Sequence, residues 1–303
     1  MKKTFVAVAV LGAFAGSAMA ADVTLYGKID LGLNYQNTKV DGQSATNKFQ
    51  EYSGQNSGSR FGLKGTEDLG NGYKVGFVLE NGFDADTGAT GQSMTNSDGS
   101  KSTRLFGREA QLYVSSDFGT LSMGRVGALT SGLGSYNLNS YMAMSTGWGD
   151  YTSKHKYFGL DRDRMDNTVT YQTPRFAGLQ ATVQYSFKTD TNENATDDFS
   201  GAEGTSDAQR YASIGLSGEY GPAQFAVGYE LTKYGVKFDS NGDPLGRELD
   251  KDGQLVFLGG NYDFEVVHLF VEGQYFKHQT AIAGFGDAFE GVIGDVKGYG
   301  LHL

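Results

Sequence analysis

The sequence predicts an all-β fold, a transmembrane antiparallel β-barrel, from the alternation of its residues, the length of its strands and the order of its connections. In the segment 23–35 one parity is mostly polar or charged, and the apolar residues of the other parity are Val23, Leu25, Ile29, Leu31, Leu33 and Tyr35. Because successive side chains of a strand point to opposite faces, this segment has an apolar face and a charged face. A tilted strand of this length reaches across the hydrocarbon of a bilayer, whereas soluble strands usually have about 5–6 residues.

The same alternation returns along the chain and predicts about twelve strands. We expect them near residues 23–35, 59–66, 73–83, 105–116, 120–126, 163–173, 179–187, 210–220, 223–232, 254–262, 266–277 and 297–303. Every second connection is short, namely 67–72, 117–119, 174–178, 221–222 and 263–265. The other connections are long and lie near 36–58, 84–104, 127–162, 188–209, 233–253 and 278–296. Short turns on one rim and long loops on the other are typical of outer-membrane barrels, and a soluble β-sandwich would not need such long strands.

The first twenty residues have the three parts of a secretory signal peptide. Two lysines precede an apolar core at residues 6–14, and a small-x-small cleavage site ends at Ala20. The core is too short for a membrane anchor, which needs about 18–20 apolar residues. We therefore expect a cleaved signal peptide at 1–20 and one barrel domain at 21–303, because no linker or composition shift divides the remainder.

The charge and the cysteine count exclude some classes of partner and chemistry. Removal of residues 1–20 takes away two lysines and no acid, so the net charge changes from −10 to −12. Nucleic acid is an improbable partner for so acidic a chain, because binding to phosphates needs a basic surface. The chain has no cysteine, so neither a disulfide framework nor thiol chemistry is available to it.

No pattern of catalytic or metal-binding residues stands out. The histidines lack the spacing of metal ligands; they are His155, His268, His278 and His302. Neither a Gly-x-Ser-x-Gly elbow nor a Walker sequence is present. The segment 239–250 imitates the start of a calcium loop, but Pro244 stands where such a loop needs glycine. We expect no cofactor and no enzymatic activity.

Several stretches, in the same order along the chain, resemble the general diffusion porins of Gram-negative outer membranes. They are 59–70, 117–120 followed by Gly124 and Arg125, and 164–167 followed by Tyr171 and Pro174. The resemblance runs from Ala21 to the end of the chain. It implies a sixteen-stranded barrel whose long third loop folds into the lumen, and a homotrimer surrounded by outer-membrane lipid and lipopolysaccharide. It further implies passive diffusion of ions and small hydrophilic solutes.

The resemblance also assigns candidate residues of a pore constriction, in which arginines of the wall oppose acids of the third loop. By position, Arg60, Arg108 and Arg164 match the wall arginines. Arg125 matches a further arginine, but it shares parity with two apolar residues, which leaves its direction open. Lys64 has the parity of Arg60, so we expect it to face the lumen.

The third loop supplies few acids. Between Val126 and Phe158 its one acid is Asp150, which we expect to oppose the arginines. A constriction with several arginines and one acid is net positive and favours anions, because a narrow passage focuses the field of its wall charges. The alternative is a surface adhesin or receptor barrel without a channel role, which would share the signal and the long loops but would not need arginines in the lumen.

Two features of the pattern are irregular. If Arg108 faces the lumen, alternation puts Glu109 and Gln111 on the lipid face, which predicts a bulge or a contact between protomers there. The last residues, 298–303, resemble half a strand and end in Leu303, whereas the family closes with an aromatic residue. We therefore expect about twelve of sixteen strands, a chain incomplete at its C-terminus, and a curved sheet with two free edges.

Overall fold

The computed structural model describes residues 22–39, 45–55, 57–90, 93–95, 101–131, 133–142, 164–189, 201–238, 243–247, 249–279 and 296–302. No helix among these residues is long and apolar enough to cross a membrane. The predicted signal peptide at 1–20 and the candidate acid Asp150 lie outside these ranges.

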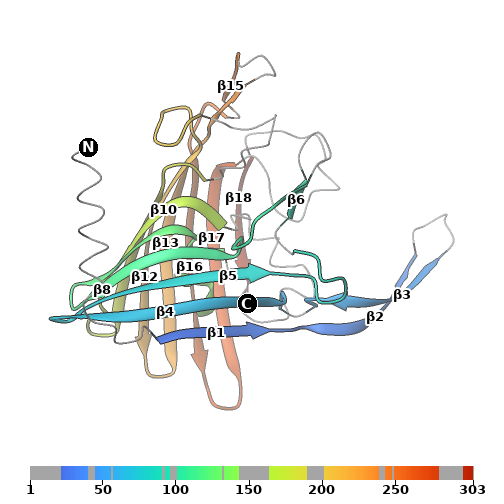
Figure 1. Ribbon diagram of the computed structural model, residues 1–303, viewed down its shortest axis with the longest axis horizontal. Helices are drawn as coiled ribbons and strands as arrows, with labels where there is room; N and C mark the ends of the chain where they lie inside the picture. The colour runs from blue at the N-terminus through green and yellow to red at the C-terminus, as the bar shows by residue number, and fades with distance from the viewer. Residues whose placement is uncertain are drawn as a thin grey trace.

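The described strands confirm an all-β antiparallel fold. One sheet holds twelve strands, and each pairs with its neighbours in antiparallel order. In spatial order they are β1 (Asp22–Lys28), β4 (Arg60–Gly70), β5 (Tyr73–Gly82), β8 (Glu109–Ser116), β9 (Gly119–Gly127), β10 (Arg164–Gln172), β11 (Leu179–Ser186), β12 (Arg210–Tyr220), β13 (Ala223–Lys233), β16 (Gly253–Asp263), β17 (His268–Gln279) and β18 (Val296–His302). The sheet curves so strongly that β1, β4 and β5 run across the view of Figure 1 while β16 and β17 run down it.

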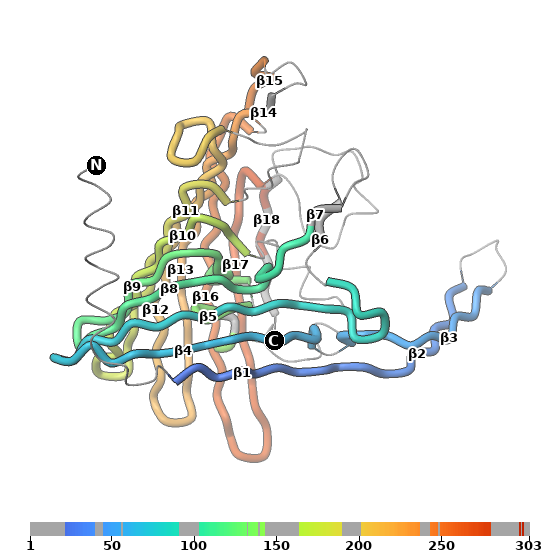
Figure 2. The backbone as a smooth tube through the Cα atoms, in the orientation of Figure 1, coloured from blue at the N-terminus to red at the C-terminus, as the bar shows by residue number. Residues whose placement is uncertain are grey.

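Three small hairpins extend the long connections beyond this sheet. They are β2 (Leu31–Thr38) with β3 (Thr46–Ser53), β6 (Ser93–Thr95) with β7 (Lys101–Thr103), and β14 (Val236–Phe238) with β15 (Pro244–Arg247). The tube in Figure 2 shows the β2–β3 hairpin reaching away from the end of β1. The long connections therefore carry their own strands on the rim opposite the short turns.

The prediction of one strand over 23–35 is wrong, because the chain leaves the sheet after Lys28. At the break, the amide of Asp30 donates to Ser59 Oγ at 3.0 Å, and the same hydroxyl donates to the Asp30 carbonyl at 3.1 Å. The amide of Gly54 also donates to that carbonyl at 2.9 Å. With the backbone groups of Asp30 bound in this way, the alternating residues from Leu31 onward pair with β3 instead of continuing β1.

The two faces of the sheet have the reverse of the usual order, with apolar side chains exposed and polar side chains buried. Leu25 is 71% exposed, and Leu112, Ile214, Val227 and Leu258 are exposed as well. On the other face, buried polar side chains are Thr170, Thr182, Gln184, Ser213, Ser217, Glu230 and Thr232. An outward apolar band around a polar interior is the arrangement of a barrel in lipid.

The inner face is covered by part of the third long loop, which confirms that this loop folds into the lumen. From the loop, Leu129, Tyr136, Leu138 and Met142 join a buried apolar cluster with Val126 at the end of β9. The wall residues of that cluster are Ala226, Leu255, Phe257 and Phe276, which belong to β13, β16 and β17. The described loop residues 128–131 and 133–142, with the short helix η2 (Asn139–Tyr141), therefore lie across the inner wall and not outside it.

Glu109 and Gln111, for which alternation from Arg108 predicts a bulge or a contact between protomers, instead contact the inner loop. Ser135 Oγ of the inner loop donates to Glu109 Oε1 at 2.6 Å, and Tyr136 Oη donates to Gln111 Oε1 at 3.1 Å. Both wall residues are buried by these contacts. The reason is that Arg108 precedes the first residue of β8, so strand alternation does not fix its direction relative to Glu109.

The two faces predict opposite responses to a lysine at neighbouring positions of β1. Leu25→Lys should destabilise the barrel in lipid by about 2–4 kcal/mol, because it puts a charge on the apolar band. Thr24→Lys, on the lumen face opposite Lys64, should change stability by less than about 1 kcal/mol. Urea unfolding of both variants in lipid vesicles measures the difference. Equal losses would contradict the assignment of the two faces.

Candidate pore constriction

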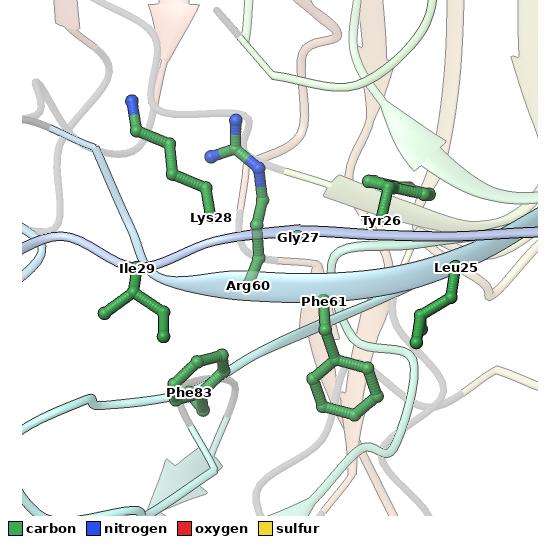
Figure 3. A pocket seen from close by; sticks show the side chains of 8 residues that line it. All are labelled: Leu25, Tyr26, Gly27, Lys28, Ile29, Arg60, Phe61 and Phe83. Carbon is green, nitrogen blue, oxygen red and sulfur yellow. The ribbon is translucent and has the colours of Figure 1, made fainter.

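Where the C-terminal half of β1 lies beside the start of β4, charged and apolar side chains point to opposite sides of the sheet. A hollow of about 730 Å³ lies here, and its lining residues are Leu25, Tyr26, Gly27, Lys28, Ile29, Arg60, Phe61 and Phe83. In Figure 3, Tyr26, Lys28 and Arg60 point to one side of the strands, and the large apolar side chains point to the other. Lys28 lies opposite Arg60 in the register, so the two cations are neighbours on the lumen face.

The carboxylate of Glu80 on β5 is the centre of this group. Arg108 Nε donates to Glu80 Oε1 at 2.6 Å, and Arg60 Nε lies 3.8 Å from Oε2. Tyr26 Oη donates to Glu80 Oε2 at 3.0 Å. The structure thus brings together Arg60, the first residue of β4, and Arg108, which directly precedes β8, on either side of β5. It places between them an acid that the sequence analysis did not identify.

The absence of a side chain at Gly62 makes this arrangement possible. Gly62 lies between Tyr26 on β1 and Glu80 on β5 in the register of the sheet. A Cβ on Gly62 would lie 2.6 Å from Tyr26 Cζ, closer than real Cβ contacts come. The tyrosine ring therefore lies over the glycine and reaches across β4 to the carboxylate. Lys64, also on this face, holds its Nζ 5.6 Å from the centre of the same ring.

Arg125 belongs to a second charged group, centred on Asp166 of β10. Arg125 Nη1 donates to Asp166 Oδ1 at 2.6 Å, and Arg104 Nη1 donates to both carboxylate oxygens at 2.8 and 2.9 Å. Arg125 Nε also donates to the Gly107 carbonyl at 2.8 Å. The side chain of Asp166 is 8% exposed and those of Arg104 and Arg125 are 21% and 18% exposed. Asp166 thus holds Arg125 within the wall, together with Arg104.

A β-bulge aligns Asp166 with Arg125. Met165 pairs with Val126 and Thr168 pairs with Gly124, so two residues of β10 stand opposite the one residue Arg125. Asn167, the second of the two, has a φ of 49°. Such a bulge bends the strand and redirects a side chain. Arg164 opens the same strand opposite Gly127, two residues before Asp166, and does not join the group around Glu80 in the contacts described above.

The sequence contained signals for the two acids that were missed. In the predicted strand 73–83, Glu80 falls on the same face as Lys74, and this is the polar face of that strand. Asp166 lies inside the porin-like stretch 164–167. Within the described ranges, no three His, Asp or Glu side chains gather as metal ligands would.

The exposure of the ion pairs predicts how much each contributes to stability. Asp166→Asn should destabilise the protein by about 3 kcal/mol, because it leaves two largely buried guanidinium groups without their counter-charge. Asp252→Asn is the matched control, since its pair with Lys233 spans 3.6 Å and both side chains are over 40% exposed. That variant should lose less than about 1 kcal/mol. Thermal unfolding of the folded barrel measures both, and a negligible effect of Asp166→Asn would refute its proposed structural role.

Comparison with known proteins gives a family for this architecture. The family model described as Gram-negative porin matches residues 7–303. An outer membrane porin protein of Bordetella pertussis is 36% identical over 282 residues, which cover 89% of this chain and 68% of the relative. Outer membrane porin protein 32 of Delftia acidovorans is 33% identical over 292 residues, which cover 94% of this chain and 72% of the relative.

A solved structure extends the similarity to the fold. The anion-selective porin from Comamonas acidovorans superimposes with a TM-score of 0.61 and 26% sequence identity, covering 93% of this chain and 72% of that chain. Its fold agrees with the curved antiparallel sheet described above. On the family match over nearly the whole sequence and on these relatives, the chain belongs to the Gram-negative porins, the channel proteins of the outer membrane.

Proposed function

We propose that this porin is a passive diffusion channel for ions and small hydrophilic solutes that favours anions, with Arg60 and Arg108 at its constriction. The observation that carries the proposal is that these two guanidinium groups contact the same carboxylate, that of Glu80. One negative charge compensates one of the two, so a positive charge remains on the lumen face. A narrow passage with low-dielectric walls concentrates the field of such a charge.

The neighbouring residues increase the excess of positive charge on the lumen face. Lys28 lies opposite Arg60, and Lys64 lies one inward-facing step beyond Gly62 on β4. Glu109, which lies opposite Glu80 in the register, is 5% exposed and accepts hydrogen bonds from Ser135 and Gln111. Its carboxylate is therefore bound to the loop and turned from the solvent. The negative net charge of the whole chain does not oppose the proposal, because charges beyond a Debye length of about 8 Å are screened.

The solved structure that this chain resembles is titled an anion-selective porin, which agrees with the sign inferred from these residues. Arg164 and Lys64 complete the proposed positive wall. We assign Arg125 a structural role instead, because Asp166 holds it together with Arg104. Asp150 remains our prediction for the acid of the third loop, on residues outside the described ranges.

The assembled form follows from the same family resemblance. We propose that export removes residues 1–20 and that the barrel assembles as a homotrimer among outer-membrane lipid and lipopolysaccharide. A receptor or adhesin barrel is the second candidate from the sequence. The clustering of Arg60, Arg108 and Lys28 on the inner face favours the channel, because an adhesin would not need cations in its lumen.

Removal of either arginine should weaken the anion preference. At about 8 Å in water one charge changes the energy of a passing ion by about 0.5 kcal/mol, with opposite signs for anions and cations. Arg60→Ala and Arg108→Ala should therefore each lower the anion-to-cation permeability ratio roughly two- to fivefold. Reversal potentials in planar bilayers under a salt gradient measure this. Lys233→Ala, which removes a cation paired with Asp252, is the control. Unchanged reversal potentials in both arginine variants would refute the assignment of these arginines to the constriction.

Glu80→Gln should act in the opposite direction and raise the anion preference. The substitution removes the acid that Arg60 and Arg108 share, and the amide oxygen still accepts the hydrogen bond of Tyr26. The same bilayer measurement applies, with conductance as a check on pore integrity. A shift toward cations at unchanged conductance would show that Glu80 does not compensate the arginines.

A further inference from the structure

The inner loop packs on the inner wall formed by β12, β13, β16 and β17, and two wall glycines lie directly beneath its buried side chains. We propose that Gly215 of β12 and Gly259 of β16 are positioning residues of the channel. Each forms a notch that receives one side chain of the loop, Leu138 and Met142 respectively, and together they set how far the loop projects into the lumen. The inference rests on the proposed function only in taking residues 128–142 as the segment that narrows the lumen.

The notch at Gly215 is filled by leucine. A Cβ on Gly215 would lie 2.4 Å from Leu138 Cδ1 and 3.1 Å from Leu129 Cδ1. Leu138 is 4% exposed and Leu129 is fully buried. Gly215 lies between the buried residues Ser213 and Ser217, so its open side faces inward. The two leucines are tied together, since the amide of Leu138 donates to the Leu129 carbonyl at 2.8 Å. Both therefore enter the notch as one unit.

The notch at Gly259 is filled by methionine. A Cβ there would lie 2.7 Å from Met142 Cγ and 3.0 Å from its Sδ, and also 2.9 Å from the Val271 carbonyl oxygen of the wall, so the position has no room for a side chain on either account. Met142 is fully buried. Asn261, the next inward-facing residue of β16, donates from Nδ2 to the carbonyl of Tyr141 at 3.1 Å. An apolar contact and a hydrogen bond thus fix adjacent loop residues to adjacent wall positions.

Polar contacts on either side of the notches fix the loop along the wall. Thr130 Oγ1 donates to Glu230 Oε1 at 2.7 Å, and Tyr141 Oη donates to Glu219 Oε1 at 2.6 Å. Arg175 Nη2 in turn donates to Tyr141 Oη at 3.1 Å. Burial and the neighbouring Glu219 raise the pKa of the Tyr141 hydroxyl, so it stays a donor at alkaline as well as neutral pH. These bonds fix the lateral position, while the depth depends on how closely the apolar side chains approach the wall.

A methyl group at Gly215 would remove the space for Leu138. Close-packed interiors do not absorb an added carbon without displacement. The nearest atoms are the ends of two side chains, and the nearest backbone atom of the notch, the Val227 carbonyl oxygen, is 3.7 Å away. The loop is therefore the part that yields, and it moves away from β12 toward the lumen.

The test compares single-channel conductance in planar bilayers for Gly215→Ala, Leu138→Ala and the double variant of the full chain. Gly215→Ala should lose conductance, and Leu138→Ala should show added current noise from a loosened loop. The double variant should recover conductance toward the native value, because the smaller side chain makes room for the new methyl. Rescue of this kind requires that the two residues meet in the native channel. Unaltered conductance in Gly215→Ala, or a double variant no closer to native, would overturn the proposal.

Gly218→Ala is the matched control on the same strand. Its Cβ would lie 2.2 Å from Phe225 Cε1 of the neighbouring strand, on the outward-facing side of the sheet. The steric clash is therefore similar to that at Gly215, but it does not involve the loop. This variant should keep native conductance in the fraction that assembles, and Leu138→Ala should not rescue its assembly. A conductance loss equal to that of Gly215→Ala would assign the effect to the barrel and overturn the proposal.

A second measurement does not depend on Gly215→Ala assembling. The chain has no cysteine, so a single introduced thiol reports its own accessibility. Leu138→Cys should resist a charged methanethiosulfonate reagent applied to the open channel, whereas Ser140→Cys on the exposed side of the loop should react and reduce the current. Equal reactivity of the two introduced thiols would overturn the proposal that Leu138 is buried in a notch of the wall. Reversal potentials report the arginine wall separately, so a failure of anion preference with intact rescue would refute the proposed selectivity alone.

Discussion

The whole structure depends on the constraint that a strand in lipid must turn its apolar side chains outward. Leu25, Leu112 and Leu258 satisfy it on the outer face, and the polar residues of the same strands are forced onto the inner face. Charge can then gather on the inner face at high local density. Neighbouring strands lie about 4.8 Å apart, so Arg60 of β4 and Arg108, just before β8, meet across the one intervening strand β5. The proposed ion pathway is therefore a consequence of membrane insertion as much as of any single residue.

Glycine determines where large side chains can lie on that crowded inner face. At Gly62 the missing side chain lets the Tyr26 ring cross a strand and reach Glu80. At Gly215 it lets a loop leucine sit against the wall. In both places folding removes the extra conformational freedom that glycine has in the unfolded chain, and the structure gains a fixed position for a group that borders the lumen.

The loop in the lumen was expected from the resemblance to the porins. The alternation of the sequence was enough to predict the fold class and the two faces, because both depend on local periodicity. It could not predict the break at Asp30, which arises from hydrogen bonds to Ser59 and Gly54 across a long connection. Counting the alternation from Arg108 put Glu109 on the lipid face. That count fails because Arg108 lies before the first residue of β8. The pairing of Arg108 with Glu80 needed the register between strands, which no single strand contains.

The two arginine groups show why residue type alone does not define a constriction. Around Asp166 the bulge in β10 presents both carboxylate oxygens to Arg104 and Arg125, and all three side chains are largely withdrawn from solvent. Around Glu80 no bulge adjusts the register, so Arg108 makes the close contact while Arg60 stays at 3.8 Å with 28% of its side chain exposed. Arg60 is thus the most exposed of the four guanidinium groups and the one held least tightly, which leaves it accessible to a passing ion. Two arginines and one acid thus stabilise the wall around Asp166, whereas the same combination around Glu80 leaves a positive charge for the pore.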